Sequence, residues 1–186
     1  MTKKAKTPIA VRFDRYEIFE IKPQTAFTAI DLGLPSGRQW AAQNVGAHAM
    51  SDYGLLMDFD TANAIEFLDG WHLPTKEDFQ ELYDNCTSEW TTINGNPGRM
   101  FTSKINGHQI FLPAAGWSWF DDDEHGTTLY LRGTYGVYWS SSYLSATLAY
   151  NLIFNSSAVN PQNDNYRRNG FSVRAVQHLS KLKNQK

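Results

Sequence analysis

The sequence predicts an α+β fold in which two short helices pack on a mostly antiparallel sheet with long irregular loops. Helical signals are confined to residues 60–85, and the rest of the chain carries short apolar runs bounded by Gly, Asn, Pro and Ser. Because helices and strands are segregated rather than alternating, a parallel α/β sheet is disfavoured. A chain of 186 residues, 41% of them hydrophobic, is long enough to bury ~70% of its unfolded surface.

Strands are expected before the helices. Residues 9–21 are rich in Ile, Val, Phe and Tyr, which predicts one or two strands and leaves a hairpin open. Residues 26–30 and 39–45 are also strand-like, and the turn-forming sequence LPSG at 34–37 separates them.

Two helices are predicted in the middle of the chain. Asp60 or Thr61 is the expected N-cap of residues 62–68, with Gly70 suited to the end of that helix. The second helix has a stronger signal, since Thr75 and Asp78 have the spacing of a capping box.

Short strands are expected throughout the C-terminal half. Residues 149–154 alternate, with Tyr150, Leu152 and Phe154 on one face. The Asn-rich segment at 160–170 tolerates turn conformations, so a loop is predicted there.

Several segments, taken in order, resemble one family. They are DLGLPSGRQWAAQNVGA (31–47), WHLPTKEDFQELYDNCT (71–87), IFLPAAGW (110–117), YWSSS (138–142) and residues 149–176. Together they resemble the bacterial "major paralogous domain" first described in Fibrobacter succinogenes, which has the C-type lectin fold. The resemblance covers about residues 28–178. It implies a domain at 26–178, preceded by a strand-like extension at 1–25 that could serve assembly, and followed by a basic tail at 179–186.

Many relatives of this domain are variable proteins of diversity-generating retroelements, which rewrite the 3′ end of a gene with errors at adenines. The resemblance implies a variable, ligand-binding region at about 137–168. Relatives tend to carry Asn, whose codons are the usual targets, where this chain has Val137, Tyr143, Leu144, Leu148, Ile153, Ala158, Asp164, Tyr166 and Arg168. Tyr and Arg on a background of Ser and Asn are also typical of a paratope.

The sequence disfavours an enzyme and a bound cofactor. Related formylglycine-generating enzymes use a pair of cysteines, whereas this chain has only Cys86. The Glu-Pro-Asn and Trp-Asn-Asp motifs of calcium-dependent lectins are absent, so calcium-independent binding is expected. The acidic cluster at 121–124 is interpreted as a solvated loop, with a cation site as the less favoured alternative.

The expected ligand is a macromolecule, either protein or glycan, on the surface of another cell. The resemblance implies that the chain itself is displayed on a phage tail or a bacterial surface. A net charge of −2 gives no indication of nucleic-acid binding, and no apolar run approaches the ~20 residues of a membrane span. No signal peptide is recognisable, so a virion-associated or cytoplasmic protein is predicted, with surface display if a leader was removed. A homo-oligomer is left open. The alternative function is a structural or assembly protein with a fixed partner and no diversification.

Overall fold

A computed structural model describes residues 9–12, 18–21, 27–119 and 128–178. Within them the protein is mostly β, with two short helices and open, largely antiparallel sheets, which agrees with the predicted α+β class. The acidic cluster at 121–124, the tail at 179–186 and most of residues 1–25 lie outside the described residues. Neither helix is long and apolar enough, in this described part of the chain, to cross a membrane.

The structure has three small sheets besides a large one. β1 (Ile9–Arg12) pairs antiparallel with β2 (Ile18–Ile21), which decides for two strands where the sequence left one or two open. A second sheet has the order β15–β4–β3, from Val176–His178, Arg38–Ala41 and Ala29–Asp31. A third is the meander β6–β7–β8, from Cys86–Ile93, Asn96–Ser103 and Gln109–Pro113.

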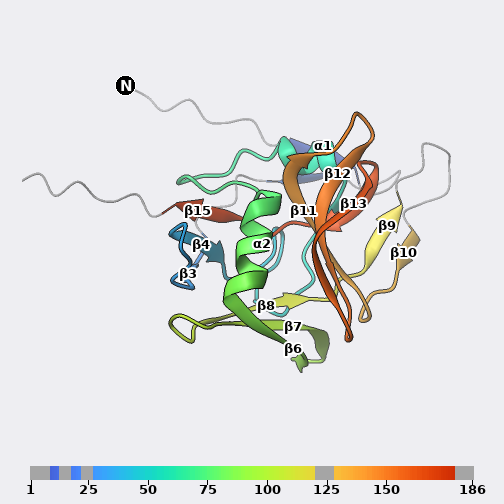
Figure 1. The fold of residues 1–186 in the computed structure, drawn as a ribbon. Helices are drawn as coiled ribbons and strands as arrows, with labels where there is room; N and C mark the ends of the chain where they lie inside the picture. The colour runs from blue at the N-terminus through green and yellow to red at the C-terminus, as the bar shows by residue number, and fades with distance from the viewer. Residues whose placement is uncertain (1–8, 13–17, 22–26, 120–127, 179–186) are drawn as a thin grey trace, which may run out of the picture.

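The large sheet is seven-stranded and has the order β10–β9–β14–β11–β12–β13, with β5 also pairing with β14. Its strands are Thr128–Tyr130 (β10), Trp117–Trp119 (β9), Asn169–Ser172 (β14), Gly136–Tyr143 (β11), Leu148–Phe154 (β12), Val159–Tyr166 (β13) and Leu56–Met57 (β5). All pairs are antiparallel except β11 with β14. In Figure 1 the strands β11, β12 and β13 stand side by side next to α2.

The centre of the large sheet is buried on both faces. Val137 and Trp139 of β11 join one hydrophobic cluster with Phe171, while Tyr138 between them joins another with Phe154. Since successive side chains of a strand point to opposite faces, β11 supplies both clusters at once. This explains why its central residues are almost all apolar or small.

Both helices form, but the first is displaced from its prediction. α1 is Phe59–Asn63, and its N-cap is Asp58 rather than Asp60 or Thr61. Asp58 accepts a hydrogen bond from the Thr61 backbone N–H, so the helix starts at Phe59, three residues before the predicted start at 62. It ends at Asn63, so the predicted helix at 64–68 is wrong. α2 is Lys76–Asn85, with the predicted Thr75–Asp78 capping box in place.

The predicted loop at 160–170 is wrong, because most of that segment belongs to β13 and β14. β13 pairs with β12 on one side and is the outermost strand of its sheet. An edge strand is held through backbone hydrogen bonds and leaves polar side chains in water, so the Asn-rich composition is compatible with it.

A buried arginine crosslinks the interior. Arg174 is fully buried and donates to Asn44 Oδ1 (2.8 Å), to the Ala41 carbonyl (2.9 Å) and to the Phe111 carbonyl (2.8 Å). No carboxylate among the described residues pairs with it. Burial lowers the pKa of Arg174 to about 10, against an opposing contribution from the nearby Tyr138 hydroxyl. Arg174 is therefore part of the core.

Candidate functional site: a groove at one end of the large sheet

A groove with a volume of about 870 Å³ opens at one end of the large sheet. We call it the Arg168 groove and define it by its lining residues, Asp58, Asp60, Trp119, Ala146, Thr147, Tyr166, Arg167 and Arg168. These come from the start of α1, the end of β9, the β11–β12 turn and the end of β13 with its following turn. In Figure 1 α1 lies beside the upper ends of β11 and β12.

Arg167 fixes one wall of the groove. Its guanidinium pairs with the Asp60 carboxylate and donates to the Ala146 carbonyl (2.9 Å). Its backbone N–H donates to the Thr147 carbonyl (2.9 Å), and its carbonyl accepts from the Phe59 N–H (2.8 Å). Arg167 thus ties α1 to both turns and is a structural residue of the site.

The two carboxylates of the groove are engaged within the chain. Asp58 Oδ1 accepts from the Thr61 N–H (2.9 Å) and its Oδ2 from the Thr61 hydroxyl (2.6 Å). Asp60 is the partner of Arg167. Both acids therefore stabilise the start of α1 and its contact with the β13–β14 turn.

Arg168 behaves differently from its neighbour. It is exposed, and its guanidinium carbon lies 4.3 Å from the centre of the Trp119 ring and 5.7 Å from that of Tyr166. Within the described residues its side chain makes no hydrogen bond or ion pair. The site therefore presents a cation supported by two aromatic rings.

The structure gathers most of the predicted ligand-contacting residues near this groove. Tyr166 and Arg168 line it, and Leu148 lies opposite Tyr166 in the β12–β13 register. Tyr143 packs edge-on against Phe59 with ring centres 5.1 Å apart. Tyr143, Leu144 and Tyr166 are 62%, 45% and 52% exposed, and Asp164 is exposed two residues before Tyr166.

Val137, Ile153 and Ala158 lie away from the groove. Val137 is only 1% exposed and belongs to a core cluster, so its predicted contact with a ligand is corrected. Ile153 pairs with Val137 and is half-buried against the same cluster. Ala158 is exposed, but it lies in the β12–β13 turn at the opposite end of the strands.

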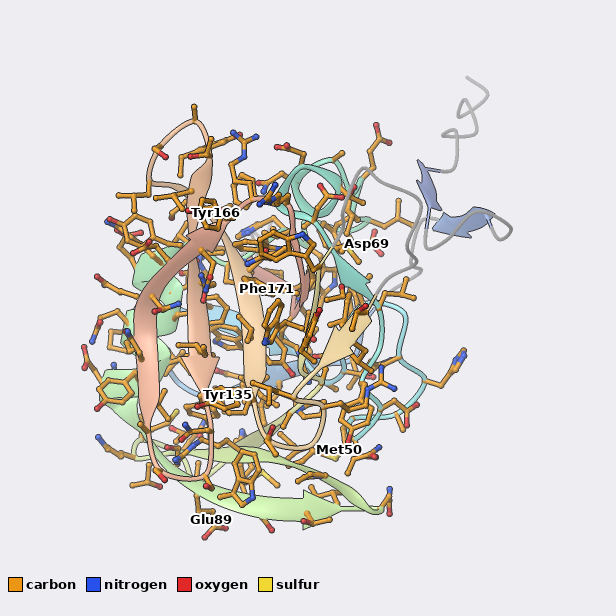
Figure 2. The ribbon with its side chains drawn as sticks, turned by 90° about the vertical axis from the view of Figure 1, so that its right-hand side faces the viewer. Met50, Asp69, Glu89, Tyr135, Tyr166 and Phe171 are labelled. Carbon is orange, nitrogen blue, oxygen red and sulfur yellow. The ribbon has the colours of Figure 1, made fainter. Side chains whose placement is uncertain are left out.

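The opposite end of these strands is tied to the β6–β7–β8 sheet. Arg99 of β7 donates to the carbonyl of Asn155 in the β12–β13 turn (2.9 Å). Figure 2 shows Tyr166 at one end of the molecule and Glu89, on the β6–β7 hairpin, at the other. Residues predicted to form one face are therefore divided between an open end and a packed end.

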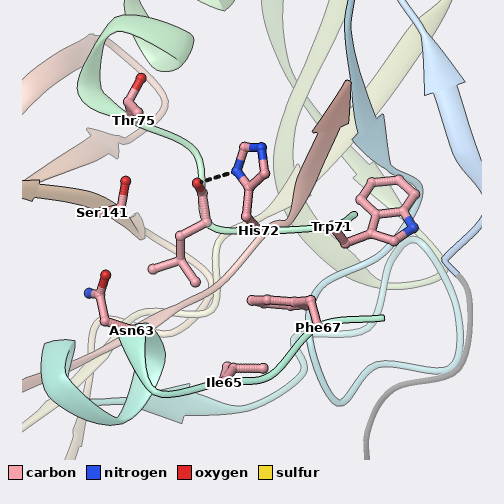
Figure 3. Close-up of a pocket in the computed structure, with 8 residues that line it drawn as sticks. Asn63, Ile65, Phe67, Trp71, His72, Thr75 and Ser141 are labelled. Carbon is pink, nitrogen blue, oxygen red and sulfur yellow. Dashed lines mark hydrogen bonds between the residues drawn. The ribbon is translucent and has the colours of Figure 1, made fainter. Parts of the chain in front are cut away.

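A second, smaller pocket of about 410 Å³ lies between α1 and α2 (Figure 3). Apolar side chains such as Ile65 and Phe67 line it together with His72 and Ser141. His72 is occupied on both ring nitrogens, by the Leu73 carbonyl (2.9 Å) and by an Arg38 N–H (3.0 Å). The two contacts of His72 therefore link the segment before α2 to Arg38.

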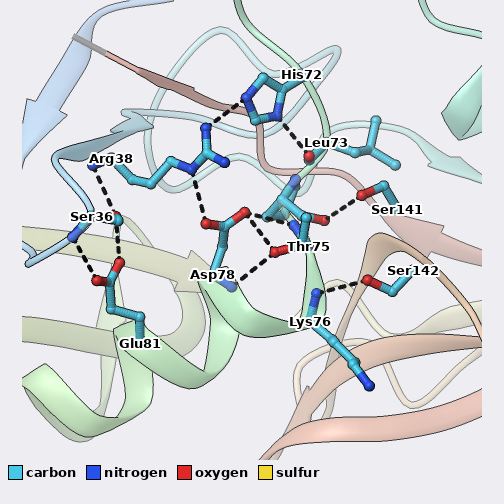
Figure 4. Close-up of polar contacts among 11 residues, drawn as sticks. Ser36, Arg38, His72, Leu73, Thr75, Lys76, Asp78, Glu81, Ser141 and Ser142 are labelled. Atoms are coloured by element: carbon cyan, nitrogen blue, oxygen red, sulfur yellow. Dashed lines mark hydrogen bonds and ion pairs between the residues drawn. The ribbon is translucent and has the colours of Figure 1, made fainter.

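The polar contacts around this pocket secure the start of α2 (Figure 4). Arg38 pairs with Asp78 at 2.9 Å, and Ser36 donates to Glu81 at 2.6 Å. The Lys76 backbone N–H donates to the Ser142 hydroxyl (3.1 Å) near the end of β11. These contacts join α2 to β4 and β11. The polar side chains around the pocket therefore have a structural role.

No arrangement for nucleophilic or metal chemistry is found in the described part of the chain. It contains no group of three His, Cys, Asp or Glu side chains placed to hold a metal ion. Cys86 is buried, and burial raises the pKa of its thiol to about 11, against a smaller opposing effect of Lys104. Such a thiol stays protonated and unreactive near neutral pH.

Sequence reasoning missed Trp119, Asp58 and Arg167 as parts of the site. The sequence Arg167–Arg168 does not indicate that the first arginine has an acidic partner and the second has none among the described residues, because that difference depends on where α1 and Trp119 lie. Trp119 comes from a strand that is distant in sequence and pairs with Asn169.

Comparison with known proteins adds one match. Residues 100–176, less than half of the chain, match a sequence family described as a domain of unknown function, DUF8237. This stretch contains Trp119, Tyr166 and both arginines of the groove, whereas α1 lies outside it. Searches among curated proteins and among solved structures found no match.

Proposed function

We propose that this chain is a non-enzymatic ligand-binding protein of the C-type lectin fold, diversified by a retroelement at its C-terminal face. The Arg168 groove and the exposed Tyr143 and Leu144 beside it are the binding face. The ligand is a protein or glycan on a cell surface, in keeping with receptor recognition by a phage or bacterium.

One observation carries the proposal. Positions that resemble the variable sites of the family, Tyr143, Leu144, Tyr166 and Arg168, are exposed around one groove. Eight positions resemble the family's constant framework. Six of them are buried and two, Tyr150 and Asn155, are half-buried; the buried ones are Trp139, Leu152, Phe154, Gly170, Phe171 and Val173. A face that must change without unfolding the protein requires this separation, because core substitutions are costly and exposed ones are not.

The exposed residue types are also suited to binding. Tyr offers a large contact area with few rotatable bonds, and Arg combines charge with a planar surface. A standard interface built on this face would bury about 800 Å² on each partner. Several copies displayed together would raise a modest affinity by ~10² or more.

The test is to sequence the 3′ end of the gene across its source population, together with the flanking DNA. We expect substitutions at adenine positions in the codons for residues 143, 144, 148, 164, 166 and 168, with a near-repeat template and a reverse transcriptase gene nearby. An invariant 3′ end without a template would reject diversification. The second candidate, an assembly protein with a fixed partner on the same exposed residues, would then remain.

A further inference from the structure

We infer that the Arg168 groove of this variant selects an acidic peptide segment, with an Asp or Glu carboxylate bound by Arg168 beside a large apolar side chain. The inference rests on the proposed function and specifies its ligand class. It follows from which charged side chains of the groove have partners among the described residues and which do not.

The described lining of the groove contains two acids and two arginines, and one of these arginines has no acidic partner among the described residues. Asp60 is neutralised by Arg167, and Asp58 accepts two hydrogen bonds from Thr61. Arg168 makes no ion pair with a described residue and is held over Trp119 and Tyr166 by its cation–π contacts. Among the described residues of the groove, a ligand therefore meets one positive charge without an acidic partner.

A guanidinium held in this way favours a carboxylate. Its N–H groups form a planar fork that matches the two oxygens of a carboxylate, and the supporting rings reduce the conformational freedom lost on binding. Lysine at the same position would supply the charge without the fork.

The surroundings favour a peptide over an acidic sugar. Tyr143 and Leu144 are exposed next to the groove, on the strand end and turn that also supply Ala146 and Thr147 to its lining. The exposed aromatic rings can pack on either an apolar peptide side chain or the CH face of a sugar, but the aliphatic Leu144 adds apolar area that a peptide side chain fills and a hydroxylated sugar does not. We therefore assign a protein ligand with an acidic and apolar sequence.

The assignment is specific to this variant. Residue 168 is among the positions proposed to change, so variants of the gene with a neutral residue at 168 should lose the preference for acidic peptides. The groove built by Arg167 and Asp60 would persist in them.

The experiment is an NMR titration of the full ¹⁵N-labelled chain with acetyl-Leu-Glu-Tyr-amide, its Gln analogue and glucuronate. We expect the Glu peptide to shift the amides of Thr147, Tyr166 and Arg168 saturably, and the Gln peptide to bind about tenfold more weakly. Arg168→Gln should abolish the difference, and Arg168→Lys should reduce it. The matched control is Arg132→Gln, since Arg132 is also exposed and lies 4.9 Å from the ring centre of Tyr53, away from the groove.

Four acidic residues at 121–124 follow Trp119 closely in sequence, so the titrations are repeated in D121N/D122N/D123N/E124Q. A preference for Glu over Gln in either background, lost with Arg168→Gln and kept with Arg132→Gln, supports the inference. Equal binding of both peptides, no shift in either background, or tighter binding of glucuronate overturns it. The proposed function is judged separately by the population sequencing, so the two failures are distinguishable.

Discussion

Residues 159–168 and 169–176 are neighbouring segments with opposite environments. The first is the outermost strand of the large sheet and its turn, where exposed residues alternate with half-buried ones and with the buried Pro161. The second is buried at every position. The first segment ends in Arg167 and Arg168, and the second contains Arg174. Arg168 is exposed without an acidic partner among the described residues, whereas Arg174 is enclosed by three acceptors. Position in the sheet, rather than residue type, decides which side chain is available to a ligand.

The largest expected difference in the free energy of unfolding is between arginine-to-methionine substitutions made separately in the two segments. Arg174→Met leaves the acceptors on Asn44, Ala41 and Phe111 unpaired in the core, and should lower the free energy of unfolding by about 3 kcal/mol or more. Arg168→Met should change it by less than about 0.5 kcal/mol. Urea unfolding followed by tryptophan fluorescence measures both, and equal losses would contradict the comparison.

The buried Cys86 thiol should make the free energy of unfolding depend on pH. The Cys86 thiol has a pKa raised to about 11 from an ordinary value near 9. The thiol of the unfolded chain loses its proton at a lower pH than the thiol of the folded protein. The buried, protonated thiol therefore adds to the free energy of unfolding below pH 9, and this contribution is lost as the pH rises towards 11. The slope has a ceiling of about 1.4 kcal/mol per pH unit. Unfolding free energies at several pH values should fall more steeply in the wild type than in Cys86→Ala; parallel curves would show that the thiol is not buried as described.

A smaller loss of stability is expected from a substitution at the start of α2, which contacts the end of β11. Thr75→Ala removes the N-cap of α2 and should cost about 1 kcal/mol. Because Lys76 and Pro74 contact Ser142 and Ser141, this change also tests whether α2 positions the strand end that carries Tyr143. Thermal unfolding gives the cost, with Thr75→Ser as the control that keeps the hydroxyl; a loss as large as that of Arg174→Met would be inconsistent with a local cap.

The smallest effect on stability is expected on the binding face itself. Tyr166→Ala removes an exposed ring, and should shift the free energy of unfolding by less than about 0.5 kcal/mol. Tyr143→Ala should cost more than Tyr166→Ala, since Tyr143 packs against Phe59 and lies under Arg167. Differential scanning calorimetry on the two variants tests this order, and the reverse order would mean that the contacts of Tyr143 contribute little.

Local signals in the sequence predicted local structure well. The Thr75–Asp78 capping box predicted the start of α2, and the turn at 34–37 is present, with the Gly37 N–H donating to the Leu34 carbonyl. The β6–β7 hairpin could also have been found, because Asn94–Gly95 between two strands is a strong hairpin-turn signal. The Asn-rich β13 could not, since its pairing with β12 depends on backbone groups that composition does not reveal.

The candidate site was less predictable because it is assembled from distant segments. Tyr143, Tyr166 and Arg168 could be proposed from the sequence, yet Val137 and Ile153 looked equivalent to them and are packed against the core. The partners that define the groove, Asp60 and Trp119, are separated from Arg168 by many residues and carry no motif. Knowledge of the strand order was needed to bring them together.

The most direct test of the separation between a variable face and a buried core is a deep mutational scan of residues 137–176, selected for folded protein by resistance to proteolysis. We predict that Tyr143, Leu144, Tyr166 and Arg168 accept most substitutions, whereas Trp139 and residues 169–176 accept few. If Tyr166 and Arg168 prove as intolerant as Trp139 and Arg174, they belong to the core of the protein, and the proposed binding face is contradicted.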